Sequence, residues 1–297
     1  MGIIRDFKVI KSKYITLVFI ALICNTATLS AANRHNLLFW TGGGYSSLSS
    51  DSNVPSSGRV GYEVGAGYEL RFRNFIMHTG FELQGINSAF VPDDFIHTRY
   101  PLVDTQGDLF TGIFYFAKIS DYNSLGYVNI PLMFGFTSKK IYFLAGAKVG
   151  VNLFGKSTVK SLVKSVGDYD EISIDHLEDI PHHSFFTREE KNVYPIKMKL
   201  NYTASFEVGM NMQPWSKKLS SRLGLFCDYG LANIHSNSYS DDLIWNKGSD
   251  LPYLPTLGST IRSSDFRNNT LNSLFVGVKF TLLFGLEGKR DCRCAWE

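Results

Sequence analysis

The stretch Tyr127–Leu153 decides the fold. It reads Tyr-Val-Asn-Ile-Pro-Leu-Met-Phe-Gly-Phe, then Thr-Ser-Lys-Lys, then Ile-Tyr-Phe-Leu-Ala-Gly-Ala-Lys-Val-Gly-Val-Asn-Leu. Every second side chain is apolar from Val128 to Phe136 and again from Ile141 to Leu153. A period of two is typical of a β-strand with one apolar and one mixed face. Each half is long enough to cross a bilayer as a tilted strand, which takes about 9–11 residues. The stretch therefore predicts a transmembrane β-hairpin with a tight polar turn.

The same alternation recurs along the chain and predicts six further strands. The first of these is the least regular, because glycines and aromatic residues interrupt its alternation. Pro131 removes one backbone donor from its strand, which predicts a bulge or a water on the lumen side. The six predicted segments are Leu37–Ser47, Gly61–Arg73, Phe75–Asn87, Ile196–Met212, Leu219–Ile234 and Leu271–Leu286.

The connections between these strands alternate between tight and long. Outer-membrane barrels have short periplasmic turns and longer extracellular loops, whereas a soluble sandwich has no reason to sort its loops in this way. The sequence thus predicts an all-β fold, an eight-stranded antiparallel up-and-down transmembrane β-barrel with long extracellular loops and with both termini in the periplasm. The long segments are Ser88–Ser124, Phe154–Pro195 and Ile234–Thr270.

Two parts of the long segments carry specific expectations. The apolar piece Leu109–Ala117 is predicted to extend a hairpin beyond the membrane. Ser157–Val166 fits either a short amphipathic helix on the outer leaflet or a plain loop.

The two ends of the chain differ from its middle. Residues 1–32 predict a secretory signal peptide, with lysines before an apolar run and small residues before the cleavage site. Residues 33–286 form the predicted barrel, and residues 287–297 a polar periplasmic tail that contains Cys292 and Cys294. Outside the N-terminus no apolar run is long enough for a spanning helix. The formal charge of +3 lies wholly in residues 1–32, so no nucleic-acid partner is implied.

The second face of the predicted strands mixes glycines with charged residues. Eight strands enclose a space just wide enough for side chains to fill, and glycines leave room for long charged neighbours. Five acids and four bases are close to balance, which favours an ion-paired lumen with a structural role over a conducting pore. Trp40, Trp215, Tyr127 and Tyr142 are predicted as aromatic residues of the membrane interface. The predicted lumen set is Glu63, Glu69, Arg71, Glu82, Lys148, Glu207, Arg222, Asp228 and Lys279.

Three segments resemble the PorT-like outer-membrane β-barrel family: Val128–Leu132, Tyr142–Gly150 and the final strand Val276–Phe284. The resemblance implies an eight-stranded barrel in the outer membrane of a Gram-negative cell, in a family whose founding member is linked to protein secretion. Two features depart from the family pattern. The long loops exceed its usual ones, and a polar tail follows Phe284, where many such barrels end in an aromatic residue.

One stretch could carry chemistry, residues 175–183, where His176, His182 and His183 lie among carboxylates and are weak candidates for metal ligands. No catalytic residue and no cofactor is predicted. We therefore expect a non-enzymatic outer-membrane protein with a structural or interaction role, linked through the resemblance to secretion or envelope assembly. The alternatives are a small pore or transporter and a lipid- or peptide-modifying enzyme. The expected partners are outer-membrane lipid and other envelope or secretion proteins.

Overall fold

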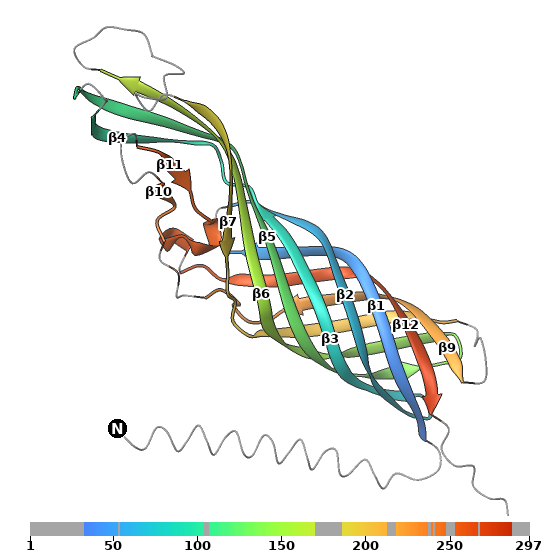
Figure 1. The fold of residues 1–297 in the computed structure, drawn as a ribbon. Coiled ribbons are helices and arrows are strands. Elements are labelled where there is room, and N and C mark those ends of the chain that lie inside the picture. The colour runs from blue at the N-terminus through green and yellow to red at the C-terminus, as the bar shows by residue number, and fades with distance from the viewer. Residues whose placement is uncertain are drawn as a thin grey trace, which may run out of the picture.

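Eight antiparallel strands close into a barrel in the computed structural model (Figure 1). They follow one another around the ring in chain order, and β1 pairs with β12 to close it. The eight-stranded up-and-down barrel predicted from the sequence is thereby confirmed. Its strands are β1 (Asn33–Ser50), β2 (Ser56–Phe72), β3 (Phe75–Phe90), β5 (Leu109–Thr137), β6 (Ile141–Asp168), β8 (Asn201–Asn211), β9 (Leu219–Gly230) and β12 (Leu271–Leu286).

The structure describes most of the chain between the two predicted terminal segments. The predicted signal peptide, the tail with Cys292 and Cys294, and the histidine-rich stretch 175–183 lie outside the described residues, as does Trp215. The described ranges are 33–52, 54–103, 107–169, 186–212, 218–236, 239, 241–247, 253–266 and 268–286. Within them, no helix is long and apolar enough to cross a membrane.

The barrel is apolar outside and polar inside. Within the described barrel strands, the outward positions between the two ends carry no Asp, Glu, Lys or Arg. Continuous exposed apolar surface of this extent is foreign to soluble monomers, whose largest patches reach a few hundred Å². Large exposed apolar side chains surround the barrel, and examples from each strand are Phe39, Val64, Phe81, Phe134, Phe143, Phe206, Leu225 and Val278.

The two ends of the barrel are unlike. One end, here named the turn end, has tight turns such as 73–74 and 138–140, where Ser138 N donates to Ile141 O at 2.7 Å. The opposite end, named the loop end, carries all the long connections (Figure 1). The predicted alternation of short and long connections is therefore present in the structure.

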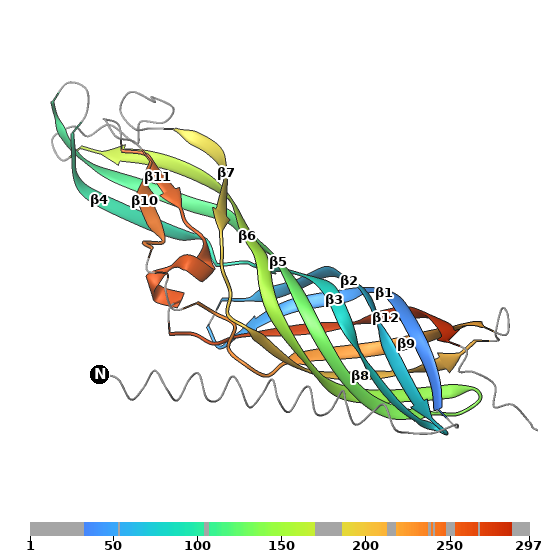
Figure 2. The ribbon, with the colours of Figure 1, turned by 60° about the horizontal axis from the view of Figure 1, so that its bottom comes forward.

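At the loop end, β5 and β6 run on far past the barrel and form the centre of a four-stranded extension of the same sheet (Figure 2). β4 (Phe95–Val103) pairs with the free side of β5, and β7 (Thr187–Pro195) pairs with the free side of β6. We name this four-stranded extension the outer sheet. Its existence corrects the prediction for Ser157–Val166, which is neither a helix nor a loop but part of β6. The predicted extension through Leu109–Ala117 is confirmed.

The outer sheet has an apolar core of its own, which explains why these polar segments fold. β10 (Ile244–Asn246) and β11 (Pro255–Leu257) pair with each other and pack against one face of the sheet. The inward-facing positions of β6 in this region alternate between serine and valine. Only every second inward position is therefore apolar, and the sequence resembles that of a polar loop. The buried core consists of Leu102, Phe110, Phe114, Phe116, Ile119, Val159, Val163, Tyr253 and Leu257.

Local details of the strands differ from the sequence expectations in three places. β8 begins at Asn201 and β9 ends at Gly230, so both are shorter than predicted. Pro131 faces inward and pairs with Lys148 in unbroken register, so no bulge lies there. The register of β5 with β6 shifts instead between Gly126 and Tyr127 and between Ala117 and Ser120. The first shift lies where β6 exchanges β8 for β7, and the second where β5 exchanges β3 for β4.

Phe114 provides a test of whether the outer sheet folds as a separate unit. Phe114→Ala removes a fully buried ring from its core, which costs about 3–5 kcal/mol for Phe in a core. We expect the outer sheet to open and to become sensitive to trypsin, while the barrel keeps a mobility in unheated electrophoresis that differs from that of the heated protein. Tyr115→Ala, on the opposite face, should leave the protease pattern unchanged. Loss of the barrel band in the Phe114 variant would contradict independent folding.

Candidate functional site in the barrel lumen

The lumen holds a network of buried charged side chains from six strands. β2, β3, β6, β8, β9 and β12 each place at least one of them at an inward position, because every second residue of a strand faces the same side. The structure brings together eight of the nine predicted lumen residues. These are Glu63, Glu69, Glu82, Lys148, Glu207, Arg222, Asp228 and Lys279, all of them buried.

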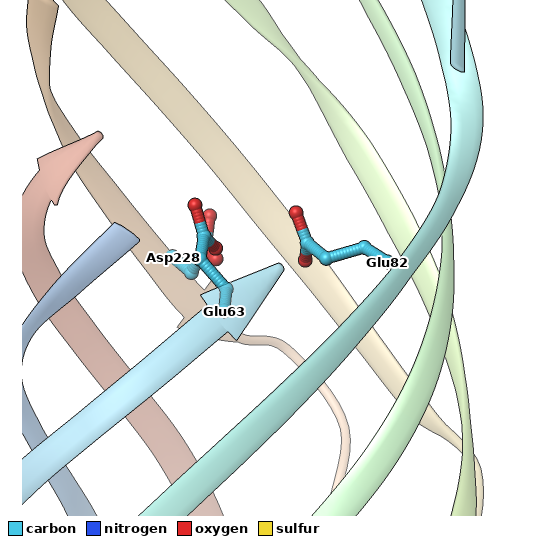
Figure 3. Close-up of side chains that lie close together, drawn as sticks. All are labelled: Glu63, Glu82 and Asp228. Carbon is cyan, nitrogen blue, oxygen red and sulfur yellow. The ribbon is translucent and has the colours of Figure 1, made fainter. Parts of the chain in front are cut away.

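Lys148 lies at the centre of this network. Its Nζ is 2.8 Å from Glu82 Oε1, 2.8 Å from Asp228 Oδ2 and 3.4 Å from Glu63 Oε2. Figure 3 shows these three carboxylates, from three different strands, pointing into the same part of the lumen. One ammonium thus joins β6 to β2, β3 and β9 across the barrel.

Three carboxylates this close together are also a conceivable cation site. Their oxygens lie within 4.8 Å of one another, a spacing that suits an oxygen-ligated ion. Lys148 already places its positive charge among all three, at distances of 2.8–3.4 Å. The protein therefore supplies its own cation here, and the cluster gives no support for a metal.

Two further ion pairs extend the network along the lumen. Lys279 Nζ lies 2.9 Å from Glu63 Oε1 and 3.1 Å from Glu207 Oε2, so Glu63 is shared between two lysines. Towards the turn end, Arg222 donates to both carboxylate oxygens of Glu69. A bidentate arginine pair of this kind fixes geometry as well as charge.

Arg71 corrects the predicted set. It lies at the turn end of β2, is only half-buried, and donates its Nε to Arg73 O at 3.0 Å. An arginine near a strand end can extend its guanidinium group towards water. Arg71 therefore does not add a charge to the lumen, although its position in the strand faces inward. Among the described lumen residues this leaves five carboxylates and three cations, so the excess of carboxylates is two where the sequence predicted one.

Neutral donors add hydrogen bonds to the carboxylates that contact Lys148. Ser205 Oγ donates to Asp228 Oδ1 at 2.6 Å, and Gln84 Nε2 donates to Asp228 Oδ2 at 3.0 Å. Asn129 Nδ2 donates to Glu82 Oε1 at 3.0 Å. A network in which most groups are paired is the arrangement that makes buried charge tolerable.

Two aromatic residues also belong to this network, against expectation. Trp40 Nε1 donates to Glu82 Oε2 at 2.9 Å, and Tyr142 OH donates to Glu207 Oε1 at 2.7 Å, so both lie inside the barrel and not at the membrane interface. Glycines beside them leave the space: a Cβ at Gly65 would lie 2.3 Å from the Trp40 ring, and one at Gly224 would lie 2.3 Å from the Tyr142 hydroxyl. The alternation already placed Tyr142 on the face opposite the apolar one, and this signal could have identified it.

An apolar cap covers the charged lumen at the loop end. It contains Tyr127, the third predicted interface residue that is buried instead, and residues of the segment 259–266, which forms the short 3-10 turns η3 (Thr260–Arg262) and η4 (Ser264–Phe266). We name this cluster the lumen cap. It consists of Leu48, Ile86, Phe90, Leu125, Tyr127, Ile196, Met198, Ile234, Ile261, Phe266 and Leu271.

Asp121 fastens the cap segment to β5. Its carboxylate accepts hydrogen bonds from Ser157 Oγ at 2.5 Å, Ser259 Oγ at 3.2 Å and the Thr260 backbone N–H at 2.7 Å. Burial raises the pKa of Asp121, and these hydrogen bonds oppose the rise. Ser157 donates directly to the carboxylate with no histidine between them, so this Ser–Asp contact lacks the base of a nucleophilic triad.

The comparisons with known proteins give distant likenesses only. No family model matches the chain, and no curated protein does. Similar solved structures include Neisserial surface protein A (7% identity, 84% of this chain, 96% of that chain, TM-score 0.32). Ail of Yersinia pestis, solved with the heparin analogue sucrose octasulfate, has 8% identity, coverage of 84% and 99%, and a TM-score of 0.27. The translocator domain of the autotransporter NalP from Neisseria meningitidis has 9% identity, coverage of 95% and 98%, and a TM-score of 0.20. These TM-scores are too low to support an argument. The fold is therefore assigned from the strand pairing, and any role has to be argued from the site.

Lys148 is the residue on which the network depends, and its removal is the direct test. Lys148→Met keeps an unbranched side chain that is one heavy atom shorter, and it leaves Glu82 and Asp228 without their cation. Breaking a buried ion pair costs about 3–5 kcal/mol, so the urea midpoint of the lipid-reconstituted protein should fall accordingly. Lys139→Met, at an exposed position of the turn end, is the control and should change the midpoint little. Equal midpoints for the two variants would show that the network does not stabilise the barrel.

Proposed function

We propose that this chain is a non-enzymatic barrel of a Gram-negative outer membrane whose lumen is closed and whose outer sheet binds other proteins of the cell envelope. The observation that carries the proposal is the double closure of the lumen. A paired charge network fills its middle, and the lumen cap covers its loop end. A barrel closed in this way acts through its outer sheet and does not conduct solutes.

The proposed orientation places the outer sheet outside the cell and both termini in the periplasm. Long loops on the extracellular side and short turns in the periplasm are the rule for such barrels. The resemblance of Val128–Leu132 and Val276–Phe284 to the PorT-like family supports a role in protein secretion or envelope assembly. The secretion role rests on these segments alone.

The shape of the outer sheet supports an interaction role. A folded sheet with its own core is a larger and more rigid surface than the mobile loops that usually follow barrel strands. Its outer face and free edge expose large apolar side chains, which at sites beyond the membrane mark protein contacts. These side chains are Ile96, Tyr100, Leu109, Tyr115 and Val193.

Conductance separates the proposed role from a small pore. We expect the protein to give no stable current steps in planar bilayers, because ions would have to cross both the lumen cap and a paired charge network. An open porin reconstituted in the same way supplies the positive control. Reproducible steps carried by the wild-type protein would favour the pore or transporter and would contradict a closed lumen.

Site-specific photo-crosslinking in the native membrane tests the interaction role. A photoreactive residue at position 100, where Tyr100 on β4 is 60% exposed, should form a discrete adduct with another protein. The matched control is position 136, where Phe136 is 63% exposed at the turn end of the apolar surface and should meet only lipid. The position-100 adduct should disappear when Phe114→Ala opens the outer sheet. Identical patterns at the two positions would contradict the proposal.

A further inference from the structure

A groove crosses the outer wall of the barrel where the apolar surface ends and the outer sheet begins. Its volume is about 620 Å³, and it spans β2, β3, β5 and β6. Among its lining residues are two cations and no acid. The lining consists of Gly58, Arg59, Val60, Asn87, Tyr122, Asn123, Ser124, Lys156 and Thr158.

A β-bulge puts Arg59 at this groove. The register of β2 with β3 shifts between Gly58 and Tyr62, and as a result Arg59 and Val60 are both exposed. Strict alternation from the outward Tyr62 would have turned Arg59 towards the lumen. Bulges are a recognised way of redirecting one side chain of a strand, so the position of this cation is a specific feature of the backbone.

The Tyr122 ring lies close to two cations, Arg59 of β2 and Lys160 of β6, of which Arg59 lines the groove. The Arg59 guanidinium lies 4.6 Å from the centre of the Tyr122 ring, and Lys160 Nζ lies 5.4 Å from it. Lys156 pairs with Ser124 in the β5–β6 ladder, two residues nearer the barrel than the pair of Tyr122 and Thr158. Cation–π contacts restrain long side chains, so the Arg59 guanidinium is held at the groove before any anion arrives.

The level of the groove relative to the membrane indicates what binds there. On β6, the outward apolar run ends at Phe154, and Lys156 is the next outward position. On β2 the same change occurs between Val60 and Arg59. Lipid headgroups lie at this boundary, with their phosphates above and their acyl chains beside the apolar wall.

We propose that this groove binds the phosphate-bearing headgroup of a membrane lipid, with Arg59 and Lys156 on the phosphate and Val60 and Phe154 against the acyl chains. Arginine and lysine are the usual partners of phosphate. The inference rests on the proposed membrane placement of the barrel. A free phosphate would gain nothing from the exposed apolar side chains below the groove, and for this reason a lipid is the better fit.

Lipid binding to the purified protein tests the proposal. The probes are bis-phosphorylated lipid A and the same lipid with both phosphates removed, each titrated into the protein in neutral detergent and followed by native mass spectrometry. Arg59→Gln/Lys156→Gln should bind the phosphorylated lipid roughly 30-fold more weakly, since each cation near a membrane surface contributes about 1 kcal/mol. Lys139→Gln/Lys140→Gln, which removes two exposed lysines at the turn end, should match the wild type.

Three results would overturn the proposal. They are equal affinity for the two lipids, equal loss of affinity in the two double variants, and displacement of lipid A by inorganic pyrophosphate at concentrations matching the affinity of the lipid. Heat-dependent electrophoretic mobility checks that every variant is folded, with Lys156→Gln alone as a milder substitute. Failure of the folded wild-type protein to insert into liposomes would refute the membrane placement itself, a result separate from loss of the phosphate preference.

Discussion

Backbone hydrogen bonding in hydrocarbon is the constraint on which the rest of the structure depends. An unpaired N–H or C=O costs several kcal/mol in lipid, so a sheet can span a membrane only when it has no edge. The pairing of β1 with β12 meets this demand, and it forces the side chains to divide into an outward and an inward set. The outward side chains contact lipid. The inward side chains must pack and pair with one another in the narrow interior of an eight-stranded barrel.

The charge network follows from that confinement. Desolvating a carboxylate is costly unless a cation and hydrogen-bond donors replace the lost water. Lys148 and Lys279 contact four carboxylates between them, with Glu63 shared, and Trp40, Tyr142 and Ser205 donate further hydrogen bonds to these carboxylates. Because these partners come from strands on opposite sides of the ring, the network also fixes which residues face each other across the lumen. The same side chains that make the interior tolerable therefore hold the barrel in one arrangement.

How much of this could be predicted depends on the range of the interactions involved. Alternation is a local signal, and it is enough to assign the two faces of every barrel strand except β1 and so to place eight lumen residues. The outer sheet was missed as a sheet because its inward valines alternate with serines and its core includes Tyr253 and Leu257, about ninety residues further along the chain. The position of the Arg71 guanidinium depends on how near the residue lies to the end of its strand. The position of the Trp40 ring depends on the space that Gly65 leaves by having no side chain. Neither of these can be predicted from the alternation of apolar and polar residues along a strand.

The outer sheet and the lumen cap are connected through β5, which contributes residues to both. β5 contributes Leu125 and Tyr127 to the lumen cap, and four residues beyond Leu125 it holds the segment 259–260 through Asp121. Above that point it becomes the centre of the outer sheet. A partner that moved the outer sheet against the barrel would strain the hydrogen bonds of Asp121 first, since they join β5 to a segment outside its own sheet. One buried carboxylate thus ties a segment of the lumen cap to the strand from which the outer sheet extends.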